Sequence, residues 1–247
     1  MSLRYRSVLP LVAVCLALVV APAFAARTLT DVQTLGNAPV PNATLNAVDC
    51  SMGQTGPVAF SIRFIFPPND EYHTLLVPGP DCCPGGGATA ITVAHAILNW
   101  PAVCQIPVNV SILGATGDVA CPVPDPNNVI CPPTFFILDG TGGGAIQHDF
   151  PMPAGCCIQG PAFLKIDFIA DGSCPPDPAG LNAPRLITDN TPDNCTSYNF
   201  YPGDPVFRDL IVAYGFPGNP VMWAEGHCCG ATPTIPSTWG SVKSLYR

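Results

Sequence analysis

Three pairs of adjacent cysteines are the residues whose type and spacing point most directly to chemistry: Cys82 with Cys83, Cys156 with Cys157, and Cys228 with Cys229. Cysteine thiolates bind zinc, exchange disulfides or form structural crosslinks. Zinc and redox sites favour two cysteines separated by two residues, and no C-x-x-C occurs in this sequence. Adjacent side chains on an extended backbone also point to opposite sides, which disfavours a shared ion. The doublets therefore predict disulfides.

The predicted disulfide framework uses twelve cysteines: Cys50, Cys82, Cys83, Cys104, Cys121, Cys131, Cys156, Cys157, Cys174, Cys195, Cys228 and Cys229. Neighbouring Cα atoms lie about 3.8 Å apart, below the usual minimum of about 4.4 Å for a disulfide. Each doublet is therefore expected to tie one turn to two separate segments. Two local pairs are plausible, Cys121–Cys131 and Cys174–Cys195, and the remaining connectivity is left open.

One loop carries the side chains that suggest a metal ion. The segment TDNTPDN contains Asp189, Asn190, Asp193 and Asn194, and oxygen ligands of this kind suit calcium. Asp and Asn beside proline are also common turn formers, and the spacing is not that of an EF-hand. Calcium is the one cofactor that the sequence suggests.

Catalytic residues are harder to assign. Glu71 and Glu225 are the only glutamates, and a pair of carboxylates could serve a glycoside hydrolase. The serine-hydrolase pattern G-x-S-x-G does not occur, and we assign no catalytic residue. Aromatic side chains could form either a sugar-stacking face or part of the core: Trp100, Trp223, Trp239, Tyr198, Phe200 and Tyr201.

These residues must be positioned by strands, because apolar and polar residues alternate along many segments. In 106–113 the alternation places Asn109 and Ser111 outward, and in 162–169 it places Lys165 and Asp167 opposite the apolar face. Further strands are predicted at 58–66, 91–98, 206–214 and 220–226, and weaker ones at 29–36, 134–138, 145–150, 184–188 and 197–201.

With 31 prolines, 23 glycines and few helix-forming surface residues, the sequence predicts an all-β fold. We expect a disulfide-stapled, jelly-roll-like β-sandwich of roughly nine to eleven strands with little or no helix.

The N-terminal residues predict export. Residues 1–25 have a basic start, an apolar run and the small-x-small site Ala23-Phe24-Ala25, which is the layout of a secretory signal peptide. We expect cleavage near Ala25 and one β-sandwich domain over 26–247, with no transmembrane span in the mature chain. The mature chain has seven basic and 17 acidic residues, a net charge of −10, which excludes nucleic acid as a partner.

The C-terminal third carries a resemblance. The segments PAFLKIDFIADG, RLITDNTPDN and FPGNPVMW resemble a module of uncharacterised secreted proteins of environmental bacteria. The resemblance covers roughly residues 145–229. It implies a jelly-roll-like β-sandwich on an exported protein, and it implies no activity or catalytic residue.

Together these patterns predict a secreted, non-catalytic extracellular or cell-surface module; its ligand is left open, with carbohydrate as one candidate. One alternative is a structural subunit of an envelope or extracellular assembly, and another is a carbohydrate-active hydrolase that uses Glu71 and Glu225. Glycans or other surface proteins are the expected partners.

Overall fold

The computed structural model describes residues 27–38, 50–84, 86–174 and 184–230. The predicted signal peptide and Trp239 lie outside the described residues. Two antiparallel sheets make up most of what is described, so the predicted all-β class is confirmed. No helix in this part of the chain has the length and apolar character needed to cross a bilayer.

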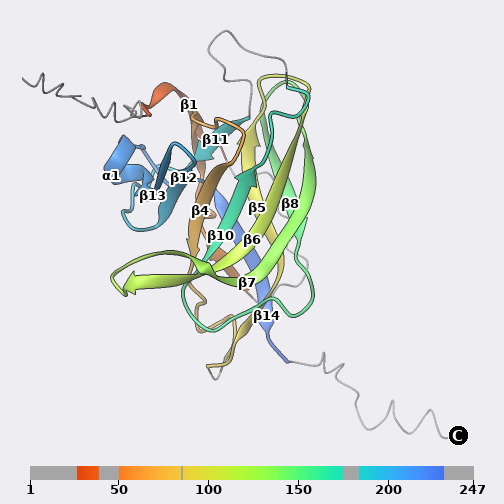
Figure 1. Cartoon of the computed structure of the whole chain (residues 1–247), viewed down its shortest axis with the longest axis vertical. Helices are drawn as coiled ribbons and strands as arrows, with labels where there is room; N and C mark the ends of the chain where they lie inside the picture. The colour runs from red at the N-terminus through yellow and green to blue at the C-terminus, as the bar shows by residue number, and fades with distance from the viewer. Residues whose placement is uncertain (1–26, 39–49, 85, 175–183, 231–247) are drawn as a thin grey trace, which may run out of the picture.

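The larger sheet has eight strands: β1 (Thr30–Ala38), β2 (Cys50–Gly53), β3 (Val58–Arg63), β5 (Thr89–Asn99), β8 (Ala145–Pro151), β9 (Cys157–Ile158), β11 (Arg185–Thr188) and β14 (Met222–Cys228). The smaller sheet has six, in the order β13 (Asp204–Asp209), β12 (Ser197–Tyr201), β4 (Asp70–Leu76), β10 (Ala162–Phe168), β6 (Gln105–Asp118) and β7 (Cys121–Asp139). Figure 1 shows the two sheets stacked face to face.

One hydrophobic core fills the space between the sheets. It contains Leu98 and Met222 from the larger sheet together with Val110 and Ile166 from the smaller one, all at most 3% exposed. Because strand residues alternate between faces, the residues between these core positions point outward. The predicted outward positions of Asn109, Ser111, Lys165 and Asp167 follow this alternation.

A central strand, β4, was not predicted. Its inward-facing residues Asp70, Tyr72 and Thr74 are polar or amphipathic, so no apolar alternation marks it. The buried Asp70 carboxylate accepts hydrogen bonds from Arg27, Tyr72, Asn199 and the backbone N–H of Phe66 at 2.6–2.9 Å. These bonds satisfy a charge that would otherwise be costly to bury.

The predicted strand 206–214 is only half correct. Its first part lies in β13, and its last five residues form the helix α1 (Leu210–Tyr214). The Asp209 carboxylate caps the helix by accepting from the backbone N–H groups of Ile211 and Val212, and Gly215 ends it in the left-handed conformation at φ 71°.

All twelve cysteines are joined in six disulfides: Cys50–Cys82, Cys83–Cys228, Cys104–Cys174, Cys121–Cys195, Cys131–Cys156 and Cys157–Cys229. Each doublet bonds to two different segments, as predicted. The local pairs Cys121–Cys131 and Cys174–Cys195 were wrong. Cys121 lies at the tip of the β6–β7 hairpin and Cys131 is buried in the core ten residues later, so a bent strand separates them.

The end of the β6–β7 hairpin, residues 114–128, leaves the sheet and is called the arm below. Three register shifts between Val110 and Gly114 mark bulges, which bend a hairpin. Gly114 pairs with Ala162, the first residue of β10, so the arm continues past the end of β10. The Cys121–Cys195 disulfide and a 2.8 Å hydrogen bond from Tyr198 to the Pro122 carbonyl hold its tip at β12. In Figure 1 the tip extends to the left of β4.

Candidate functional site

The predicted calcium loop forms a tight turn. Asp189 is buried, and its Oδ1 accepts from the backbone N–H groups of Thr191 and Asn219 at 3.0 and 2.8 Å, while its Oδ2 accepts from the Thr191 hydroxyl at 2.5 Å. Asn190, Asp193 and Asn194 are exposed beside it. In the described part of the chain no group of three or more His, Cys, Asp or Glu is arranged to hold a metal ion. Calcium binding here stays a prediction.

The two glutamates cannot act as a hydrolase pair. Glu71 lies on β4 next to the core residue Tyr72, and Glu225 lies on β14 next to the core residue Ala224. Alternation therefore turns both carboxylates away from the core, on the outer faces of different sheets. Two packed sheets about 10 Å apart separate these faces, so no single glycosidic bond can lie between the two carboxylates.

The candidate aromatic residues within the described part of the chain do not form one exposed face. Trp100, Trp223 and Tyr198 are buried, and Phe200 and Tyr201 are half-buried. The large exposed ring belongs instead to Phe135 on β7, which is 57% exposed. Phe135 faces outward because its neighbour Phe136 packs against the core residue Phe150.

Phe135 is one end of a row of five side chains that crosses the outer face of the six-stranded sheet. The register pairs Phe135 with Asn109, Asn109 with Asp167, Asp167 with Glu71, and Glu71 with Phe200. We call these five residues the polar row. It spans four strand spacings, about 19 Å.

A lysine and a histidine contact the carboxylates in the middle of the row. Lys165 Nζ lies 2.5 Å from Glu71 Oε1 and 4.0 Å from Asp167 Oδ2. His73 Nε2 lies 3.2 Å from the second oxygen of Glu71. Both oxygens of Glu71 are therefore occupied, whereas Asp167 Oδ1 has no hydrogen-bond partner.

The two carboxyl groups differ in acidity. Burial raises the pKa of Asp167 to about 6, because the attraction of Lys165 does not offset burial and the neighbouring charges of Glu71 and Asp70. Burial also acts on Glu71, but hydrogen bonds and charges from His73 and Lys165 outweigh it and lower the pKa of that carboxyl. Burial lowers the pKa of His73, and the Glu71 carboxylate, which accepts a hydrogen bond from His73 Nε2, opposes this lowering.

The row is bordered on two sides. At the β12 end, the ring of Phe207 of β13 packs edge-on against His73, with centroids 5.1 Å apart, and lies tilted against Phe200, with centroids 5.2 Å apart. On another side, the arm continues past the end of β10, and Tyr198 and the Cys121–Cys195 disulfide hold its tip at β12. The result is a strip with a half-buried aromatic end, a polar middle and an exposed aromatic end.

A second polar cluster lies on the outer face of the eight-stranded sheet. His95 Nδ1 lies 2.8 Å from Asp149 Oδ1, its Nε2 lies 3.6 Å from Glu225 Oε1, and its ring stacks on Trp223 at 4.7 Å. His95 and Glu225 are only 5% and 6% exposed. This burial makes the cluster a poor contact surface for a ligand, and we favour the polar row.

The alternation of apolar and polar residues predicted the outward direction of Asn109, Lys165 and Asp167, but it could not predict that they lie in one row with Glu71. That arrangement depends on β4 lying next to β10, and β4 carries no apolar alternation. Phe135 was placed in a predicted strand without a role, because its exposure depends on β7 being the sheet edge.

Two solved structures are similar to this chain. One contains the cysteine protease and lectin-like domains of Cwp84, a surface layer associated protein of Clostridium difficile, at 13% identity and a TM-score of 0.47, covering 74% of this chain and 37% of that one. The other is a clostridial form of this protease after propeptide cleavage, at 12% identity and a TM-score of 0.42, covering 66% of this chain. This chain thus spans 37% of each longer chain.

No curated protein matches the sequence. A family model, the domain of unknown function DUF7451, matches residues 67–226, which is more than half of the chain and includes all five residues of the polar row. The chain therefore belongs to the DUF7451 family.

Proposed function

We propose that this protein is an extracellular, non-catalytic module that binds an extended, neutral carbohydrate along the polar row. The observation that carries the proposal is the exposed Phe135 ring beside Asn109, which in turn lies beside Asp167 on the same sheet face. An aromatic ring packs against the C–H face of a sugar, while an amide and a carboxylate exchange hydrogen bonds with its hydroxyl groups. The length of the row, about 19 Å, suits several linked sugar rings rather than one.

The charges of the row support a neutral ligand. Lys165 lies between two carboxylates, so the middle of the row offers neither an unpaired cation for an acidic sugar nor a strong anionic site. The Asp167 side chain keeps 16% of its surface exposed, so its carboxylate can accept a hydrogen bond from a ligand hydroxyl on that side.

The non-catalytic part of the proposal rests on Glu71. Its two oxygens are engaged by Lys165 and His73, so this carboxylate is not poised to attack a sugar. The extracellular part rests on the six disulfides, which are typical of oxidising compartments, and on the predicted signal peptide.

The test uses the exported, purified chain and a panel of soluble neutral polysaccharides: mixed-linkage β-glucan, xyloglucan, glucomannan and galactomannan. In affinity electrophoresis at least one should retard the native chain, and the same polysaccharide titrated calorimetrically should give a Kd. Phe135→Ala should weaken that Kd at least tenfold, because it removes the stacking ring, and Asn109→Ala should weaken it several-fold. Val103→Ala, at a residue 77% exposed and outside the row, is the matched control and should bind like the native chain.

Assembly is the second candidate, because β7 is an edge strand that exposes Val129, Phe135 and Ile137. Strand β1 does not add to it, because it pairs with β3 of its own chain. No retardation by any polysaccharide, together with oligomers in sedimentation velocity that Ile137→Lys dissolves, would replace the binding proposal by assembly.

A further inference from the structure

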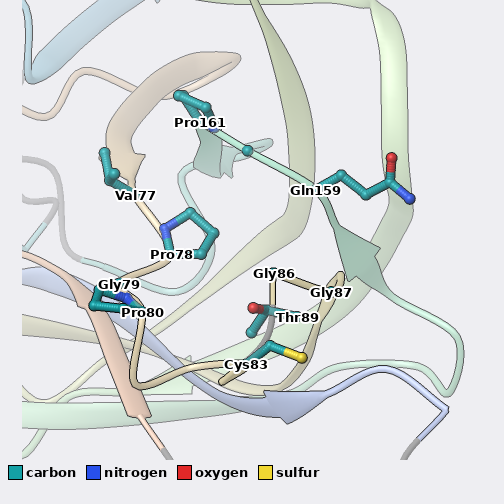
Figure 2. A pocket seen from close by; sticks show the side chains of 11 residues that line it. Val77, Pro78, Gly79, Pro80, Cys83, Gly86, Gly87, Thr89, Gln159 and Pro161 are labelled. Carbon is teal, nitrogen blue, oxygen red and sulfur yellow. The ribbon is translucent and has the colours of Figure 1, made fainter.

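A cavity of about 320 Å³ lies at the opposite end of the molecule from the loop that joins β7 to β8. Two segments line it: residues between 77 and 89, after β4, and residues 159–161, before β10. Figure 2 shows Val77, Pro78 and Pro161 on one side and Gly86, Gly87 and Gln159 across the pocket from them. It does not overlap the polar row.

Disulfides hold both walls in place. Cys82 and Cys83 of the first segment are bonded to Cys50 on β2 and to Cys228 on β14. The second segment directly follows Cys156 and Cys157, which are bonded to Cys131 and Cys229. Four of the six disulfides thus crosslink the two segments that line this pocket, or the residues next to them, to other parts of the fold. A pocket with fixed walls binds without the entropy cost of ordering loops.

The chemistry of the lining selects a neutral ligand. None of the lining residues has an ionisable side chain, since Cys83 is in a disulfide. Proline rings and Val77 offer apolar surface for C–H groups. The glycines expose backbone amides and carbonyls, and Thr89 and Gln159 add a hydroxyl and a carboxamide. An anion or a cation would find no partner of opposite charge here.

We propose that this pocket binds a single neutral sugar ring, as a second site independent of the polar row. A pyranose has apolar C–H faces and a rim of hydroxyl groups that both donate and accept, which matches walls of proline and exposed backbone. The cavity is at the lower end of the size range of small-molecule sites, about 300 Å³, so it suits one ring rather than an extended chain. The pocket would hold the terminal ring of a glycan, and the polar row would hold an internal stretch of a glycan.

Two glycines allow the pocket to be filled without straining the backbone. A Cβ atom at Gly160 or at Gly79 meets no atom within 4 Å, and neither residue has a positive φ. A phenylalanine at either position should occupy the pocket. Gly143 has the same properties but lies in the loop after β7. The backbone N–H of Trp100, just after β5, donates to the Gly144 carbonyl, so this loop lies at the end of β5 that is far from the pocket. At the rise per residue of a strand, the length of β5 puts the loop about 30 Å from the pocket.

The experiment is saturation-transfer NMR on the purified chain with free glucose, galactose, mannose and N-acetylglucosamine, followed by titration of any sugar that gives a signal. We expect one of them to show saturable binding that Gly160→Phe weakens at least tenfold and Gly143→Phe leaves unchanged. Gly79→Phe, in the other lining segment, should give the same loss, which guards against a local folding defect in one variant. Melting temperatures within a few degrees of the native chain confirm that all variants fold.

The outcomes separate this site from the polar row. Phe135→Ala should leave monosaccharide binding intact, whereas Gly160→Phe should leave polysaccharide retardation intact. The proposal is overturned if no sugar of the panel binds the native chain saturably, or if both filled variants bind it as the native chain does. Loss of monosaccharide binding in Phe135→Ala alone would place that binding on the row instead.

Discussion

His148 and Asp167 show how single buried groups set the response of this fold to acid. His148 Nε2 accepts a 2.9 Å hydrogen bond from Trp100, and burial lowers its pKa from 6.5 to about 4. Between these values the unfolded chain binds a proton at this site that the folded chain does not, so the free energy of unfolding falls as the pH falls. Asp167, with a pKa raised to about 6, acts in the opposite direction.

We predict that His148→Gln, which keeps an acceptor for Trp100, flattens the loss of stability between pH 6.5 and 4. The full effect of His148 over this range is about 3 kcal/mol. Urea unfolding at pH 7 and pH 4.5 measures it. The same slope in the variant and the native chain would show that His148 is not the titrating group.

Asp167→Asn tests the pH dependence that is opposite in sign to that of His148. Above pH 6 it removes the cost of ionising a partly buried carboxyl, and it should raise the free energy of unfolding at pH 7 by about 1 kcal/mol after allowance for solvent screening. Near pH 4, where Asp167 is protonated in the folded chain, the gain should vanish. A gain that persists at pH 4 would contradict the raised pKa.

At the scale of elements, the arm depends on one disulfide. The Cys121→Ser/Cys195→Ser double variant should release residues 114–128 and lower the free energy of unfolding by roughly 2–4 kcal/mol, because 74 residues separate the two cysteines. Hydrogen exchange of the arm amides should accelerate, and polysaccharide binding should weaken as the rim of the row is lost.

The matched control is Cys104→Ser/Cys174→Ser, whose cysteines are 70 residues apart and do not touch the arm. It should lower stability by a similar amount while the arm amides keep their protection. Equal acceleration of arm exchange in both variants would mean that global destabilisation, rather than release of the arm, is being measured.

The elements also show what the sequence could predict. Strands β6 and β10 were found because their core residues, such as Val110 and Ile166, alternate with polar ones. β4 was missed because the charge on its inward face is balanced by Arg27, a residue 43 positions away whose contact no local pattern reveals. The polar row was missed for the same reason: alternation predicts which way a side chain points but not which strand lies beside it.

For the whole molecule, the doublets join the disulfides in series. Cys50 bonds to Cys82, Cys83 to Cys228, Cys229 to Cys157, and Cys156 to Cys131. A peptic digest without reduction should therefore contain one covalent cluster of five peptides, together with the two simple pairs Cys104–Cys174 and Cys121–Cys195. Mass spectrometry identifies these species. A free thiol, or a peptide pair joining Cys121 to Cys131, would contradict the connectivity.

This serial connection has a mechanical consequence. A pull applied through the two ends of the chain reaches Cys50 and Cys228, and between them the shortest covalent path runs through Cys82 and its neighbour Cys83. Tension therefore passes along a few bonds and bypasses most of the backbone of both sheets. Under shear the polar row, which lies in the chain between Cys50 and Cys228, therefore stays folded. An anchored protein of this design would keep hold of its ligand in flow, for as long as its surroundings keep the sulfurs oxidised.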